Sequence, residues 1–494
     1  MNAQPKVRCL LAMMISIVGL SVLNARAFSL LGPFESWMTF TNGFYPSDED
    51  EIGGPMCISN EYRWNVPVVT YGFDQSFLDY FGTNGVAAVE SAIAVLNNLP
   101  SASQMDASNY LTDATYYNYT AQSQGLIDLK SETLFLLVEH LGLASPSIGA
   151  FCLKDFWFTN GTITGDVLRR NFDPFTDLPS NYIGDTLLSY QLQYSVFGSE
   201  TNAWADVFPV DPLDSDPTTV ANGVPEAGAF FGGLTCDDVG GLRYLYSTNN
   251  INYEILPSDV RGVNGSALVN AAWRPGIDKI TFVPQPIDAL SGAFLPATNQ
   301  FTDTYITNGN IVQQQLERVT VQPDFLFCAT NLANNSYLFS RTETTNWLNE
   351  SALNGNSSPA GPGVIVPPVR ISFNKLGKTW NSLRGSPDDS ANVQTVEQWG
   401  TYDGSTNVPV AYPQLQTGTN QTTIQMTLML NNASSEYSWQ MAGAADADFN
   451  FQTSTNLSDW VTLFVVSNDG SVNSYINWNP SSIQRFYRIA PQNQ

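Results

Sequence analysis

The sequence predicts an α+β N-terminal domain, followed by a β-rich, sandwich-like domain and a short C-terminal β module. Apolar residues recur at helical spacing only before about residue 247, whereas strand-like segments separated by Gly, Pro, Asn and Asp continue beyond it. A chain of 494 residues is also too long for one hydrophobic core. We therefore expect a leader at residues 1–27 and domains at residues 28–247, 248–445 and 446–494.

The leader has the pattern of a secretory signal peptide. Basic residues precede an apolar run over residues 10–23, and Ala25 and Ala27 form an A-x-A cleavage site. The alternative, a membrane anchor, would need a longer apolar run of about 20 residues. We therefore expect a secreted or cell-surface protein without a membrane span once the leader is removed.

Strand and helix patterns alternate at the start of the first domain. Trp64–Phe73 is rich in β-branched and aromatic residues, which predicts a strand. Gly85–Leu99 has apolar residues at steps of three and four, which predicts an amphipathic helix. A third segment, Asp237–Tyr246, predicts a short helix capped by Thr235 or by Asp237 itself.

The helix expected over Asp128–Leu141 is the most informative element. Its N-cap is Asp128 or Ser131, and Gly142 follows the last turn as a stop signal. Its middle is apolar on every side, so we expect the helix to be buried. His140 is the only histidine in the chain, and a capping role near the last carbonyl groups is favoured over a catalytic one.

The second and third domains have strand patterns. Lys279–Val283 and Val364–Val366 predict short strands, and Asn354–Gly363 predicts a flexible loop. In the last zone, Thr453–Trp460 reads TSTNLSDW and Arg485–Ile489 reads RFYRI. These two segments resemble the short C-terminal β module of some exported bacterial proteins. The resemblance implies an appended surface or spacing module without chemistry of its own.

Charge and histidine content exclude several function classes. Asp and Glu number 45 against 20 Lys and Arg, for a net charge of -25. Such a chain repels phosphate backbones, so we expect no nucleic acid partner. With one histidine, a zinc site of three imidazoles cannot form.

Four cysteines remain after removal of the leader, and export favours their oxidation. No two of them are close enough in sequence to suggest a zinc knuckle. We expect two disulfides, and the pairing stays open. The candidates are Cys57, Cys152, Cys236 and Cys328.

Two motifs carry a second resemblance. The buried helix ends in Leu141-Gly142-Leu143, and residues 234–247 read LTCDDVGGLRYLYS. In this order, after a strand and a helix, they resemble the matrixin-like branch of the metzincin zinc peptidases. In that family the catalytic helix ends H-E-x-x-H-x-L-G-L-x-H, and a later helix starts L-T-x-D-D. The resemblance covers about residues 60–247 and implies a zincin-like fold for the N-terminal domain.

The resemblance also implies that the catalytic residues are missing. Aligned on Gly142, Phe135 and Glu139 replace the first two zinc ligands, Leu136 replaces the general base, and Ser145 replaces the third ligand. Catalytic zinc needs such donors and a water that a base can deprotonate. The resemblance therefore implies an inactive homologue without a metal cofactor at this site. The alternative is a core helix with a glycine stop that matches by coincidence.

These observations favour an exported, non-catalytic protein on a metallopeptidase-like scaffold, with an extracellular binding or structural role. Its partner would be an extracellular protein or a glycan. The alternative is a secreted hydrolase that acts on glycans through paired carboxylates, which needs no histidine. Whether the chain is an enzyme therefore stays open.

An acidic loop is a candidate structural calcium site, because calcium prefers closely spaced oxygen ligands. The alternative is a solvated loop. The aromatic residues, 28 Phe, 21 Tyr and 11 Trp, are interpreted mainly as core, with a sugar-binding platform as the alternative. The calcium candidates are Asp206, Asp211, Asp214 and Asp216.

Overall fold

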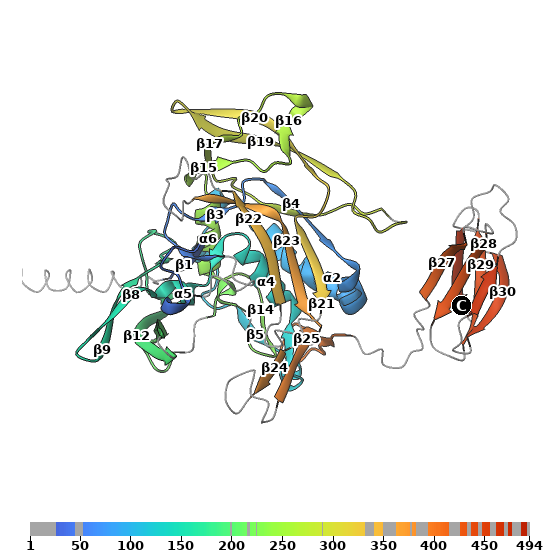
Figure 1. Cartoon of the computed structure of the whole chain (residues 1–494), viewed down its shortest axis with the longest axis horizontal. Helices are drawn as coiled ribbons and strands as arrows, with labels where there is room; N and C mark the ends of the chain where they lie inside the picture. Colours follow the sequence, from blue (N-terminus) through green and yellow to red (C-terminus); the bar gives the residue numbers. More distant parts are fainter. Residues whose placement is uncertain are drawn as a thin grey trace, which may run out of the picture. The chain divides into compact units, whose positions relative to one another are not determined.

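The computed structural model divides the chain into two units, with the boundary after residue 414 (Figure 1). In the first unit the described residues are 26–44, 53–197, 200–214, 218–223, 225–288, 290–330, 340–348, 362–375, 378–381 and 394–413. In the second unit they are 425–431, 436–442, 447–454, 461–468, 473–476 and 486–491.

A six-stranded mixed sheet forms the centre of the first unit. Its order is β18-β4-β21-β23-β22, and β3 pairs with the first residues of β23. All neighbours are parallel except β22, which is antiparallel to β23 at the edge. The strands span Tyr62–Arg63 (β3), Val68–Phe73 (β4), Thr281–Pro284 (β18), Phe325–Thr330 (β21), Ser340–Leu348 (β22) and Gly363–Asn374 (β23).

This sheet joins segments that we expected in different domains. Thr281 lies opposite Val68, and Phe325 lies opposite Tyr71. A boundary at residue 247 would separate these paired strands, so the prediction of independent domains at 28–247 and 248–445 is wrong. The broader prediction, a β-rich α+β chain with several sheets, is confirmed.

Two helices pack with this sheet. α2 (Gln75–Asn97) contacts β4, β18 and β21, and α4 (Leu129–Glu139) packs against α2. α2 begins at Asp74, whose carboxylate accepts the N–H of Phe77 at 3.0 Å. It kinks at Gly82, where φ is 59° and ψ is -160°. The helix expected over residues 85–99 is therefore the second half of α2.

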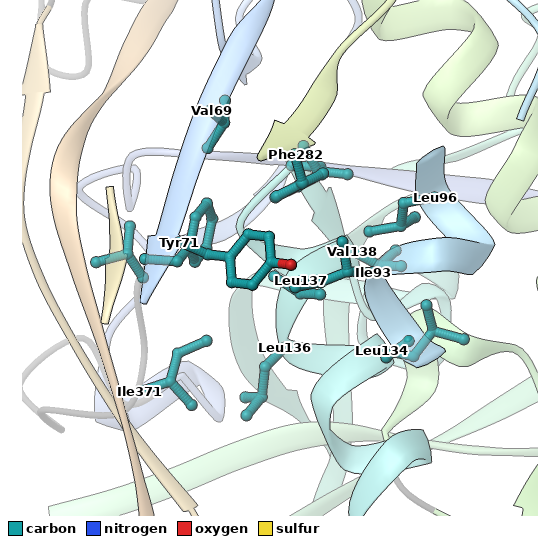
Figure 2. Packing of buried hydrophobic residues seen from close by; sticks show 14 of the residues in the cluster. Val69, Tyr71, Ile93, Leu96, Leu134, Leu136, Leu137, Val138, Phe282 and Ile371 are labelled. Atoms are coloured by element: carbon teal, nitrogen blue, oxygen red, sulfur yellow. The ribbon is translucent and has the colours of Figure 1, made fainter. Parts of the chain in front are cut away.

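The shared core of sheet and helices is rich in aromatic rings. Phe77 and Phe81 of α2 lie with their ring centroids 4.7 Å apart, and Phe77 also contacts Phe327 and Phe373 of the sheet. Figure 2 shows α4 residues Leu136 and Leu137 in the same core as Tyr71 and Ile371 of the sheet. Burial of each large apolar side chain contributes about 1.5–3 kcal/mol to stability.

A five-stranded antiparallel sheet follows in the order β15-β17-β19-β20-β16. Buried ion pairs join it to the central sheet: Arg63 to Glu254 at 2.7 Å and Arg318 to Asp324 at 2.6 Å. Such buried pairs are costly to break singly, because a charge is left without its partner. The strands span Ile251–Ile255 (β15), Val260–Gly262 (β16), Ala271–Pro275 (β17), Ala297–Thr307 (β19) and Asn310–Thr320 (β20).

Smaller sheets and two hairpins complete the first unit. The hairpins β8–β9 and β12–β13 extend outward from the body of this unit (Figure 1). The strands span Phe28–Gly32 (β1), Gly54–Met56 (β2), Thr115–Tyr117 (β5), Leu126–Asp128 (β6), Leu143–Ala144 (β7), Cys152–Thr159 (β8), Thr162–Leu168 (β9), Asn171–Phe172 (β10), Tyr182–Ile183 (β11), Thr186–Phe197 (β12), Glu200–Pro209 (β13), Ala229–Phe231 (β14), Lys378–Asn381 (β24), Gln394–Thr401 (β25) and Val410–Ala411 (β26).

The remaining helices are short. α6 confirms the helix expected over residues 237–246 and begins one residue earlier. The short helices span Tyr119–Ser123 (α3), Pro146–Ala150 (α5) and Cys236–Tyr246 (α6), with 3-10 turns at Phe40–Asn42 (η1), Ala102–Gln104 (η2), Ala107–Asn109 (η3), Val220–Asn222 (η4) and Val263–Gly265 (η5).

The second unit consists of two three-stranded antiparallel sheets, β27-β28-β31 and β30-β29-β32. Ser438 on β28 pairs with Ile476 on β31, so the unit begins before residue 446, contrary to the expected boundary. Of the two segments that carry the resemblance to a C-terminal module, the first overlaps the end of β29, and β32 contains residues 486–489 of the second. The strands span Gln425–Asn431 (β27), Glu436–Ala442 (β28), Ala447–Ser454 (β29), Val461–Asn468 (β30), Asn473–Ile476 (β31) and Phe486–Pro491 (β32).

Most of the expected leader, residues 1–25, lies outside the described residues, as does most of the expected loop at residues 354–363. At the end of the leader, Ala27 is buried and its N–H donates to Asp237 Oδ1 at 3.1 Å. Within the described part of the chain, no helix has the length and apolar character needed to cross a membrane.

Candidate functional site

Helix α4 carries the positions that the resemblance aligns with a catalytic site. It begins at Asp128, whose Oδ2 accepts the backbone N–H of Ser131 at 2.9 Å and its hydroxyl at 2.6 Å. Burial raises the pKa of Asp128 to about 6. Of the two N-caps that the sequence allows, the structure therefore selects Asp128.

The replaced catalytic positions do not form a site. Leu136, aligned with the general base, is 4% exposed and lies in the core shared with the central sheet (Figure 2). Phe135 and Glu139 are half-buried and four residues apart, so they share a helix face different from that of Leu136. Ser145 lies beyond the helix, where its hydroxyl donates to Asn222 Oδ1 at 3.1 Å.

His140 is the C-cap of α4, which confirms the capping role expected for it. Its Nδ1 lies 2.8 Å from the carbonyl oxygen of Leu136, and its own carbonyl accepts the indole N–H of Trp64 at 2.7 Å. Its Nε2 is buried without a hydrogen-bond partner among the described residues. Burial lowers the pKa of His140 to about 4, so the ring is neutral at pH 7.

Gly142 ends α4 for a steric reason. Its φ is +109°, and a Cβ atom there would lie 2.3 Å from the carbonyl oxygen of Tyr62. Its N–H donates to the backbone carbonyl of Glu139 at 2.8 Å, and its own carbonyl accepts the N–H of Leu31 at 2.8 Å. Gly142 therefore allows the chain to leave the helix and pass close to the neighbouring backbone.

The two aspartates of the LTCDDV motif organise the surrounding loops. Thr235 and Asp238 form a capping box at the start of α6. Asp238 also accepts the N–H groups of Val220 at 3.1 Å and Ala221 at 3.0 Å. Asp237 accepts the N–H of Gly184 at 2.6 Å, and burial raises its pKa well above the usual value. The cap of α6 could be predicted from the sequence, but the hydrogen bonds of the two aspartates to distant loops could not.

The expected disulfides are absent. No disulfide joins Cys57, Cys152, Cys236 or Cys328 to another cysteine among the described residues. Cys236 begins α6 and accepts a hydrogen bond from Arg26 at 2.7 Å. Burial raises the pKa of Cys236 and that of Cys152 to about 12, which keeps both protonated. The other two thiols are Cys57 and Cys328.

The three described calcium candidates, Asp206, Asp211 and Asp214, do not form a metal-binding group. Asp206 lies in β13 opposite Gln191, and Asp211 accepts the N–H of Leu213 at 2.9 Å within a turn. Asp214 donates its backbone N–H to the Asp211 carbonyl at 3.0 Å, while Asp216 lies outside the described residues. Across the described ranges, no three His, Cys, Asp or Glu side chains are placed to hold a metal ion.

A groove lies beside strand β13, and its second cavity is bordered in part by residues of η4 and β14, two elements that contact α4. A cavity of about 550 Å³ is bordered by Phe40, Phe44, Phe151 and Trp204. A second cavity of about 340 Å³ is bordered by Phe208, Phe231 and Thr219. Both contain Ser147 and Val207 in their walls, so they adjoin. We call the two cavities together the hairpin groove.

Both neutral polar groups and aromatic rings line the hairpin groove. Asn42, Ser195 and Asn202 border the first cavity, and Thr218 and Asn222 border the second. No Asp, Glu, Lys, Arg or His is among the described residues that line either cavity. The groove thus combines apolar surface with a few hydroxyl and amide groups, as small-ligand sites commonly do.

Sequence reasoning missed this groove. Its walls come from η1, α5, β13 and η4, which are distant in sequence. One local signal was present: Trp204 and Phe208 are four residues apart in a strand and therefore face the same side. Comparison of the chain with family models, curated proteins and solved structures finds no match.

Proposed function

We propose that the chain is an exported, non-catalytic protein with an extracellular binding role, built on a scaffold that resembles a zinc peptidase of the matrixin-like type. The observation that carries the proposal is the side-chain environment of α4. A catalytic zinc site needs three protein donors and an open position for water. Here the position of the general base is held by Leu136, which lies among apolar side chains of the core.

The space at the end of α4 also argues against hydrolysis there. A cavity bordered by Leu141, Leu242 and Tyr246 has a volume of about 30 Å³. The side chains that line this cavity are mainly apolar, and no His, Cys or Glu is among the described residues there. Tyr246 further donates its hydroxyl to the Leu141 carbonyl at 2.6 Å, which holds α6 against the helix end.

The hydrolase alternative lacks a supporting observation in the hairpin groove. Glycosidases use two carboxyl groups about 5–10 Å apart in the substrate cleft. The walls of the groove contain aromatic, amide and hydroxyl groups, with no carboxylate among the described residues. This composition supports binding rather than bond cleavage.

Export follows from the leader and is part of the proposal. The experiment is expression of the full chain in a secreting host, followed by N-terminal sequencing of the protein outside the cells. We expect Phe28 as the first residue, since cleavage should follow Ala27. A chain that stays inside the cells with Met1 intact would contradict export.

The non-catalytic assignment is tested by metal analysis and peptidase assays on the purified full chain. We expect no stoichiometric zinc and no cleavage of casein above the level of a His140→Gln control. One zinc per chain in the wild type that is lost in His140→Gln would overturn the proposal. A matched Glu139→Gln variant reports whether any bound metal uses the adjacent carboxylate instead.

A further inference from the structure

We propose that the hairpin groove binds a neutral oligosaccharide. This inference rests on the binding role proposed above and names its ligand class. The first step is the accessibility of the aromatic rings. Trp204 is 39% exposed and Phe40 is 54% exposed, and both border the 550 Å³ cavity. Aromatic rings that remain open beside a cavity offer flat apolar surfaces, on which the C–H faces of sugar rings can stack.

The second step is the approach of the backbone to Trp204. Gly43 has a φ of +82°, and a Cβ atom there would lie 2.9 Å from the Cβ of Trp204. Gly43 therefore lets η1 come close to β13. The same elements contribute Phe40, Asn42 and Trp204 to the groove, so two rings and an amide meet there.

The third step is the charge of the walls. The chain contains 65 charged Asp, Glu, Lys and Arg residues, yet none of them lines either cavity within the described residues. A phosphorylated, carboxylated or cationic ligand would find no partner for its charge there, and desolvation of that charge would oppose binding. The ligand that fits these walls is neutral.

The fourth step is the presence of buried polar atoms without a partner. Thr219 is 1% exposed and borders the second cavity, and its Oγ1 has no hydrogen-bond partner among the described residues. In the first cavity, Asn202 Oδ1 is likewise buried without a hydrogen-bond partner among the described residues. Unpartnered buried polar atoms are costly, and a ligand that supplies donors and acceptors removes the cost. Sugar hydroxyl groups both donate and accept, which matches a hydroxyl and an amide.

An extended peptide that adds to the edge of β13 is the competing occupant. β13 is the last strand of its sheet in the described part of the chain. Peptides bound in this way are held mainly by backbone hydrogen bonds, with side chains in alternate pockets. The groove instead offers side-chain amides and hydroxyls beside open rings, which favours the oligosaccharide.

The test uses the full mature chain and five probes: cellohexaose, mannohexaose, chitohexaose, hexagalacturonate and a neutral extended hexapeptide. Binding is measured by isothermal titration calorimetry and by tryptophan fluorescence. We expect at least one neutral hexasaccharide to bind and hexagalacturonate not to bind. Trp204→Ala should weaken binding by about tenfold or more, since a stacked ring contributes at least about 1.4 kcal/mol.

Two further variants separate binding from folding. Asn202→Ala removes an amide whose Oδ1 has no partner in the described chain, so it should weaken binding while the melting temperature stays unchanged. Trp157→Ala is the matched control, because Trp157 is 45% exposed but does not border the groove. It should leave the affinity unchanged.

Three outcomes would overturn the inference. One is the absence of binding by every neutral hexasaccharide at millimolar concentration. Another is an equal loss of affinity in Trp204→Ala and Trp157→Ala. The third is binding of the hexapeptide alone, with loss in Trp204→Ala, which would assign the groove to the edge strand. None of these outcomes affects the metal analysis, so failure of the ligand assignment and failure of the non-catalytic assignment are distinguishable.

Discussion

Helix α4 and the hairpin groove differ in the solvent exposure of their large apolar side chains. In α4, Leu136 is 4% exposed and fills the core beside the central sheet. In the groove, Trp204 is 39% exposed and borders an open cavity with neutral polar neighbours. A buried leucine contributes to stability, whereas an open ring beside a cavity contributes contacts to a ligand. The helix position at which the proposed matrixin-like resemblance expects a general base is thus part of the core, whereas the groove keeps an aromatic ring open to solvent.

The largest effect is expected for Leu136→Glu, which introduces a carboxyl group at the position where the proposed matrixin-like resemblance expects a general base. A carboxylate at this position would be buried without a partner, and we expect a loss of about 4–5 kcal/mol in the free energy of unfolding. Urea denaturation measures the loss. Leu111→Glu is the control, because Leu111 is 59% exposed and the change there should stay within about 0.5 kcal/mol.

A variant Leu136→Glu as stable as the wild type would mean that this face of α4 is open to water. The contrast between a filled core helix and an open groove would then be lost. The non-catalytic assignment would lose the observation on which it depends.

The next largest effect is the pH dependence of the unfolding free energy that the buried His140 ring causes. The pKa of His140 is lowered to about 4 in the folded chain, against about 6.5 in an unfolded chain. Between these values the unfolded state binds the proton and the folded state does not, so stability falls as the pH falls from 6.5 to 4. The loss amounts to about 3 kcal/mol when complete.

Titration of Asp128 has the opposite effect on the unfolding free energy over part of the same pH range. Its pKa is raised to about 6, so the folded state takes up a proton first as the pH falls, and this stabilises the fold. The wild-type curve alone therefore combines both effects. The measurement is the difference in unfolding free energy between wild type and His140→Gln from pH 7 to pH 4, in which the contribution of Asp128 cancels. A difference independent of pH would contradict the burial of the neutral ring.

Gly142→Ala tests the exit from α4. The new Cβ would approach the Tyr62 carbonyl oxygen to 2.3 Å in a backbone with φ of +109°, and we expect a loss of about 2–3 kcal/mol. Gly161→Ala is the control, because Gly161 has a φ of +81° but nothing within 4 Å of the added atom. It should lose only the conformational cost of about 1 kcal/mol. Equal losses would mean that the approach to Tyr62 contributes nothing.

Local sequence signals were sufficient to predict helices α4 and α6 and their capping residues. Asp128 and Thr235 are N-caps with side chains that accept backbone N–H groups, and Gly142 has the positive φ of a helix stop. Each of these depends on residues within a few positions of one another, so spacing alone could predict them. The burial of α4 also followed from its apolar residues on every side.

The pairing of the central sheet could not be predicted in this way. β4 and β21 are both short apolar strands, and neither sequence indicates which strand it will pair with. The domain boundary at residue 247 failed for this reason. The hairpin groove could not be predicted from the sequence either, because Phe40, Ser147 and Trp204 are far apart in the sequence and come together only in the folded chain. The disulfides were overpredicted because an even cysteine count carries no information about distance.

The smallest expected effect is that of a reducing agent. Two disulfides would each contribute about 2–4 kcal/mol, and their reduction would lower the melting temperature by several degrees. Because the described cysteines form no disulfide, dithiothreitol should leave the melting temperature unchanged, and thiol titration of the chain without its leader in urea should find four thiols. In the native protein the half-buried Cys57 should react first, since Cys152 and Cys236 are buried and protonated. A melting temperature that falls on reduction would show that the core around α4 is held covalently as well as by packing. The losses expected for Leu136→Glu and Gly142→Ala would then have to be measured again in reduced protein.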